Sequence, residues 1–167
     1  CGEKNEMLLV PENHSNISFN NEVIESDSLN ILNYEYIYNG GGVAIADFNR
    51  DGKEDIYFTG NVVNNKLYLN EGDFVFNDVS SISQTECKGS WSMGVSVIDI
   101  NNDKWPDMYV SVSGKGEAIN RKNILLINQG INKDSIPIFE NMAEEYGLDH
   151  TGYTITSYFF DFDQDGD

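Results

Sequence analysis

The chain has 167 residues, of which 40% are hydrophobic and 12% aromatic, so it can bury a core and is not a wholly disordered protein. Its 28 acidic and 10 basic side chains give a formal net charge of -18. Because nucleic acid binding needs surfaces rich in Lys and Arg, this balance argues against nucleic acid as a partner and favours cations. No stretch approaches the roughly 18 consecutive apolar residues of a membrane helix.

The sequence begins at Cys1, which a small residue and then a polar, acidic run follow. This start resembles the mature end of a bacterial lipoprotein, whose first cysteine carries the lipid. The resemblance implies lipidation of Cys1 and an outer-membrane location, facing the periplasm or the cell surface. Residues 1–16 then form a polar tether. An arbitrary boundary at Cys1 is the alternative. If Cys1 is lipidated, Cys87 is a lone thiol and no disulfide is expected.

Residues 17–41 are rich in Asn, Ser, Glu and Tyr and show neither the period of a strand nor that of a helix. We expect an ordered loop segment there. A repeated unit begins after it, because like residues recur 52 positions apart: Val43 and Val95, Asp47 and Asp99, Asp51 and Asp103, Asp55 and Asp107. Residues 65–72 match residues 123–130, and a third copy opens near Asp161. A unit of about 50 to 60 residues is typical of propeller blades.

Each complete unit holds four short apolar runs rich in Val, Ile, Phe and Tyr, which predict four β-strands. In the first unit, the runs are residues 43–48, 55–59, 66–70 and 74–79, with a hairpin turn at 70–73. In the second unit, they are residues 95–100, 107–112, 124–128 and 138–142, although residues 140–146 also fit a helical turn. We therefore predict an all-β fold of four-stranded antiparallel blades: residues 42–90, residues 91–150, and the start of a third at 151–167.

Residues 47–55 form the strongest motif. Side-chain oxygens stand at its alternate positions one, three and five, Gly52 permits a sharp reversal, and the seventh position offers a carbonyl. Calcium takes about six to eight oxygen ligands and tolerates the irregular geometry of a short loop. Magnesium needs a tighter octahedron, and zinc favours His and Cys, which these loops lack. A solvated Asp and Asn turn without metal is the alternative for a single loop, but its recurrence favours calcium.

The EF-hand is the obvious competing motif, but it needs a Glu at position 12 and helices on both sides. Position 12 is Phe58 in the first loop and Val110 in the second, and the closing carboxylate comes at position nine. Between strands, this pattern resembles the calcium loops of integrin α-chain propellers and of FG-GAP and VCBS repeats. Residues 29–43 look like those of Bacteroidota outer-membrane lipoproteins that combine VCBS repeats with a domain related to cartilage acidic protein. These resemblances imply a propeller of about seven blades, of which this chain supplies about three.

The resemblance also implies the ligands of each calcium ion. The first site is formed by Asp47, Asn49, Asp51, the carbonyl of Lys53, and Asp55. The second is formed by Asp99, Asn101, Asp103, the carbonyl of Trp105, and Asp107. The third is formed by Asp161, Asp163, Asp165 and the carbonyl of Asp167. The second loop departs from the pattern because Lys104 replaces the glycine, so Lys104 has to adopt a positive φ at some cost.

The sequence shows neither a pair of carboxylates suited to hydrolysis nor a nucleophile beside a base, so a binding or scaffolding module is favoured over an enzyme. His14 and His150 fit surface positions, and Trp91 and Trp105 fit either core packing or a carbohydrate or protein site. We expect calcium to stiffen a platform for a protein or glycan partner. The alternatives are a substrate-organising part of a polysaccharide lyase or hydrolase, and a subunit of an outer-membrane uptake or assembly complex with a β-barrel partner.

Overall fold

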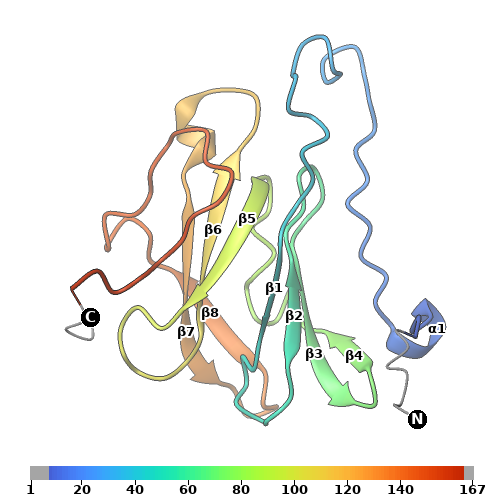
Figure 1. The fold of residues 1–167 in the computed structure, drawn as a ribbon, viewed down its shortest axis with the longest axis vertical. Coiled ribbons are helices and arrows are strands. Elements are labelled where there is room, and N and C mark those ends of the chain that lie inside the picture. Colours follow the sequence, from blue (N-terminus) through green and yellow to red (C-terminus); the bar gives the residue numbers. More distant parts are fainter. Residues whose placement is uncertain (1–7, 164–167) are drawn as a thin grey trace, which may run out of the picture.

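A computed structural model describes residues 8–163, and within them the fold is all-β, as predicted. Eight strands form two four-stranded sheets (Figure 1). Sheet A contains β1 (Val43–Ala46), β2 (Asp55–Phe58), β3 (Lys66–Gly72) and β4 (Val75–Asp78). Sheet B contains β5 (Trp91–Ile98), β6 (Asp107–Ser113), β7 (Ile124–Ile131) and β8 (Pro137–Asn141). The described residues also contain α1 (Glu12–Ser15) and the 3-10 helix η1 (Ala118–Arg121).

Both sheets are antiparallel meanders in which each strand pairs with the next one along the chain. Val43 pairs with Phe58 in sheet A, and Val95 pairs with Val110, at the corresponding position of sheet B. Because the same register recurs 52 residues later, the repeat read from the sequence is a repeat of structure. Each sheet has the strand count and the order predicted for one blade.

The hairpin turn of sheet A lies further along the chain than predicted. β3 continues to Gly72, whose partner is Val75, and the two residues between them, Asp73 and Phe74, have φ values of 49° and 59°. Positive φ at both central positions is the geometry of a type I′ hairpin. The prediction of residues 70–73 was wrong because Asn70 does not start the turn. Its Oδ1 accepts a 2.9 Å bond from the Gly72 N–H, which forms a bulge within the strand.

The main hydrophobic core lies between the two sheets. Sheet A and the loop after β1 contribute fully buried Phe48, Tyr57 and Leu67, and sheet B contributes fully buried Met108 and Val110. Each such side chain stabilises the fold by about 1.5–3 kcal/mol relative to an exposed one. The sheets therefore pack face to face through residues that alternate along their strands, as expected of neighbouring blades.

The face of sheet B that points away from sheet A is covered by the end of the described chain. Tyr109 packs edge-on against Phe159, with 5.3 Å between the ring centroids, in a second apolar cluster with Leu125 and Ile127. The Gly94 N–H donates a 2.7 Å bond to the Ile155 carbonyl, so residues 151–163 run beside β5. The sequence predicts the start of a third blade at residues 151–167; the described part of it, residues 151–163, contains no strand, and the rest falls outside the described residues.

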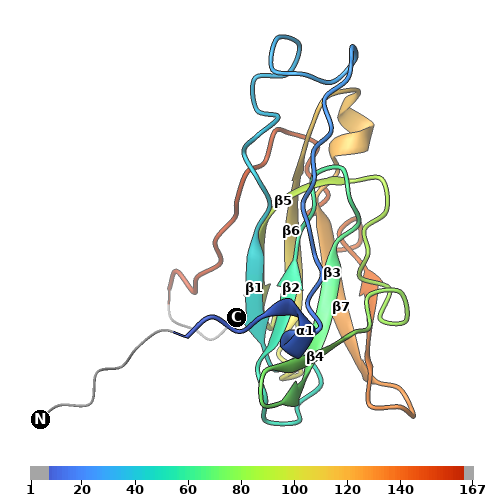
Figure 2. The same cartoon turned by 90° about the vertical axis from the view of Figure 1, so that its right-hand side faces the viewer.

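Residues 17–41 contain no helix or strand and extend past one end of the sheets (Figures 1 and 2). Side-chain contacts tie this segment to the sheets. The Phe19 ring stacks on Phe58 at a centroid distance of 5.0 Å, and the amide of Asn21 exchanges two hydrogen bonds with Asn61, of 2.8 and 2.9 Å. Figure 2 shows the chain running from there to α1, which lies against β4. This loop segment therefore covers part of sheet A.

Cys87 is half-buried, and its Sγ lies 3.6 Å from the hydroxyl of Tyr57. Burial raises the pKa of this thiol to about 11. The thiol is therefore protonated at neutral pH, which suits a structural residue better than a nucleophile. Both histidines, His14 and His150, are exposed, as expected.

Candidate functional site

The two complete acidic loops occupy the same place in their sheets. Residues 47–54 join β1 to β2, and residues 99–106 join β5 to β6. Both loops are flanked by strands, which excludes the helix–loop–helix arrangement of an EF-hand. The closing aspartates, Asp55 and Asp107, are the first residues of the next strands and are fully buried.

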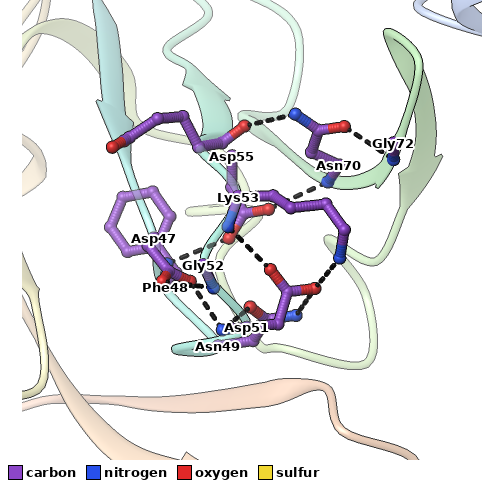
Figure 3. A network of polar contacts seen from close by, with 10 residues as sticks. Asp47, Phe48, Asn49, Asp51, Gly52, Lys53, Asp55, Asn70 and Gly72 are labelled. Carbon is purple, nitrogen blue, oxygen red and sulfur yellow. Dashed lines mark hydrogen bonds and ion pairs between the residues drawn. The ribbon is translucent and has the colours of Figure 1, made fainter.

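The first loop is folded around its own carboxylates (Figure 3). The two oxygens of Asp47 accept bonds of 2.9 Å from the Asp51 N–H and 2.8 Å from the Gly52 N–H. Asn49 Oδ1 also accepts from the Asp51 N–H at 3.1 Å, and Asp51 Oδ1 accepts from the Lys53 N–H at 3.0 Å. Because each side chain bonds to the backbone two to five residues further on, the side chains of Asp47, Asn49 and Asp51 lie on the inside of one turn.

The second loop makes the same hydrogen bonds at its equivalent positions, although the residues between its Asp and Asn side chains differ. The oxygens of Asp99 accept from the N–H groups of Asp103 at 3.0 Å and Lys104 at 2.9 Å. Asn101 Oδ1 accepts from the Asp103 N–H at 3.1 Å, and Asp103 Oδ1 accepts from the Trp105 N–H at 2.8 Å. The shared geometry therefore comes from the spacing of Asp and Asn, not from the residues between them.

Each loop needs positive φ at two positions. At the sixth position, Gly52 has φ 86° and Lys104 has φ 71°, which confirms the conformation predicted for the lysine. At the fourth position, Arg50 and Asn102 both have φ 58°. The requirement at Arg50 could not be predicted, because arginine has no preference for the left-handed region.

The closing aspartates join the loops to the sheets. Asp55 accepts bonds of 2.9 Å from the N–H groups of both Phe48 and Asn70. Asp107 accepts the corresponding bonds from Ile100 at 3.1 Å and Asn128 at 2.8 Å. Asn70 and Asn128 were not predicted as site residues, although they occupy equivalent positions in the matching segments 65–72 and 123–130.

The closing carboxylates are costly to ionise where they lie. Burial raises the pKa of Asp55 to about 6, although the N–H groups of Asn70 and Phe48 favour the charged form. Burial likewise raises the pKa of Asp107 to about 6. Within residues 8–163, neither carboxylate forms an ion pair. A hard divalent cation in either loop would offset this cost.

The donor set of each loop consists of oxygen atoms and fits calcium. A carboxylate oxygen that accepts one N–H bond keeps a second lone pair, so the bonds to the backbone leave acceptors available. In the described part of the chain, however, no three His, Cys, Asp or Glu side chains are gathered into a group that could hold a metal ion. The proposed ligands also include Asn and main-chain carbonyls. An ion would therefore have to draw the carboxylates of each loop closer together.

The third acidic loop is only partly described. Asp161 and Asp163 lie in residues 151–163 and are exposed, and Asp165 and Asp167 fall outside the described residues. The third site therefore stays a prediction of the sequence.

Lys53 already holds a positive charge next to the first loop. Its Nζ lies 2.6 Å from Asp51 Oδ2, and this pair holds the pKa of Asp51 below its ordinary value. If calcium binds in the first loop, we expect Lys53→Ala to tighten that binding by about twofold to fivefold, because it removes a competing cation from a half-exposed pair. Calorimetric titration at low salt measures this. Lys88→Ala, which removes a lysine paired with Glu86 at 2.9 Å, is the matched control and should leave the affinity unchanged.

One known family resembles part of the chain. Residues 47–110 match the family model of the FG-GAP-like repeat. The match begins at Asp47, spans both complete acidic loops, and ends within β6. No curated protein matches the chain. Together with the two four-stranded antiparallel sheets, the FG-GAP-like match supports a repeat module of the β-propeller type.

Proposed function

We propose that this chain is a calcium-binding module of propeller blades that presents a stiffened surface to a protein or glycan partner. One observation carries the proposal. The same loop is built twice with the same hydrogen bonds, and each copy ends in a buried carboxylate without an ion pair in residues 8–163. Buried charges are normally paired or coordinate a metal, so a cation in each loop would account for its buried closing carboxylate.

Calcium would act on the loops that join the first two strands of each sheet. In the first loop its ligands are Asp47, Asn49, Asp51, the carbonyl of Lys53, and Asp55. In the second loop they are Asp99, Asn101, Asp103, the carbonyl of Trp105, and Asp107. Each ion also offsets two units of the net charge of -18, which lowers the self-repulsion of the folded chain. The loops and the strand ends would then form a rigid edge on which a partner can bind.

Isothermal titration calorimetry tests this proposal. We expect Asp51→Ala and Asp103→Ala each to remove one calcium site relative to the unchanged chain, because both residues are exposed and the sheets do not depend on them. Asp134→Ala removes the same charge from an exposed turn and should retain every site. A titration without heat at millimolar calcium, or equal stoichiometry in all the variants, would reject the proposal.

The lipid anchor on Cys1 and the outer-membrane location stay predictions of the sequence, because Cys1 lies outside the described residues. No helix within residues 8–163 has the length and apolar character needed to cross a membrane. Nothing in these residues favours the polysaccharide-degrading enzyme or the uptake complex over the binding module.

A further inference from the structure

The two acidic loops are connected across the interface between the sheets. The link is Asn128, on β7, whose side chain is buried. Its Nδ2 donates a 3.0 Å bond to the carbonyl of Phe48, which lies inside the first loop. The same Nδ2 donates a 3.3 Å bond to the carbonyl of Pro106, which precedes the closing aspartate of the second loop. One amide group therefore contacts both loops.

Two further bonds fix the orientation of Asn128. Its backbone N–H donates to Asp107 Oδ1 at 2.8 Å, and its own Oδ1 accepts a 3.0 Å bond from the Gly130 N–H. Because Oδ1 faces an N–H donor, the donor Nδ2 must face the two carbonyls, and the amide cannot be turned over without losing three bonds. Asn128 is thus held rigidly by its own sheet.

Phe48 connects Asn128 to the first loop. Its N–H donates to Asp55 Oδ2 at 2.9 Å and its carbonyl accepts from Asn128, so both ends of the residue are fixed. Its ring is fully buried and packs edge-on against Phe139 of sheet B, with 6.0 Å between the centroids. Phe48 stands between Asp47 and Asn49. Its placement therefore sets where these two proposed ligands point.

We infer that Asn128 is a positioning residue shared by both loops, so that the calcium affinity of the first loop depends on a side chain carried by the second sheet. This inference rests on the proposed function. A second contact also joins the two loops: the guanidinium of Arg50, in the first loop, lies 4.9 Å from the ring centroid of Trp105, in the second loop. The two loops therefore share contacts, and a cation bound in one loop would affect the contacts of the other.

Asn70 of sheet A provides a control within the same chain. Its N–H donates to Asp55 Oδ1 at 2.9 Å, its Nδ2 donates to the carbonyl of Glu54 at 3.0 Å, and its Oδ1 accepts from Gly72 at 2.9 Å. These are the bonds that Asn128 makes to its own loop. Asn128 has in addition the bond to the other loop, so a difference between the two asparagines reports that bond.

The test measures the calcium affinity of one loop in a variant whose other loop has lost a ligand. In an Asp103→Ala background, Asn128→Ala should weaken calcium binding at the first loop by about threefold to tenfold, the effect of one buried hydrogen bond. In an Asp51→Ala background, Asn70→Ala should leave binding at the second loop unchanged. If Asn128 only stabilised the fold, the two asparagine variants would change the calcium affinity of the measured loop to the same extent. The readout is the dissociation constant from calorimetry, with circular dichroism of each variant to verify folding.

Each outcome decides one question. If the unchanged chain does not bind calcium, the proposed function fails. If the unchanged chain binds calcium but Asn128→Ala leaves the affinity of the first loop unchanged, the shared positioning role of Asn128 is overturned. Should Asn128→Ala not fold, Asn128→Leu takes its place, because it keeps about the volume of the side chain and lacks both donated bonds without adding a charge. The same weakening at the first loop is expected of it, and an unchanged affinity overturns the inference.

Discussion

Phe48→Ala is expected to lower the free energy of unfolding by about 3–5 kcal/mol, the usual cost of deleting a buried aromatic ring. Phe48 has no exposed surface and fills the space between the sheets against Phe139. Its loss leaves a cavity at the place where the first acidic loop meets the core. Urea denaturation in the presence of chelator measures the change without any contribution from calcium.

The repeat provides the control for this substitution. Ile100 occupies the position of Phe48 in the second loop, and its N–H makes the same bond to the closing aspartate, but its side chain is only half-buried. Ile100→Ala should therefore cost about 1–2 kcal/mol, less than a fully buried aliphatic residue. A loss for Phe48→Ala that does not exceed the loss for Ile100→Ala would contradict the assignment of Phe48 to the shared core.

Removal of calcium should have the second large effect. A site that binds only the folded chain adds about 2.7 kcal/mol when free calcium is about 100-fold above the dissociation constant. For a chain of this size, about 1 kcal/mol shifts the melting temperature by roughly 2–4 °C. We therefore expect chelator to lower the melting temperature by about 5–10 °C for each occupied loop, as measured by scanning calorimetry at matched ionic strength.

A double variant shows whether the two loops cause this shift. Asp51→Ala together with Asp103→Ala removes one exposed ligand from each loop and leaves the closing aspartates in place. Its melting temperature should respond little to chelator. Equal responses of the double variant and the unchanged chain would assign the calcium effect to another part of the protein, and no response in either would reject it.

The sequence predicted the strands and the acidic loops well because the repeat provides each signal twice. Apolar runs with the same spacing mark β1 and β5, although β5 begins at Trp91 and not at the predicted Val95, and the alternating oxygens of residues 47–51 recur at 99–103. The positive φ of Lys104 could be predicted because Lys104 is equivalent to Gly52 in the repeat. Local pattern and repetition thus determine each blade and the conformation of each loop.

What the sequence could not predict depends on contacts between segments far apart in the chain. Asn128 bonds to Phe48, which lies 80 residues before it, and no local pattern indicates that pair. The path of residues 17–41 depends on contacts such as the stacking of Phe19 on Phe58. The turn after β3 moved because the bulge at Asn70 adds a residue to one strand. Tertiary packing, not propensity, decides these features.

The most direct test of the account is a crystal structure of this chain grown in millimolar calcium. The account predicts one ion in each complete loop, with calcium–oxygen distances of about 2.3–2.6 Å. The side-chain ligands should be Asp47, Asn49, Asp51 and Asp55 in the first loop, and Asp99, Asn101, Asp103 and Asp107 in the second. Loops that hold only water at that concentration, with their carboxylates still bonded to the backbone N–H groups alone, would contradict it.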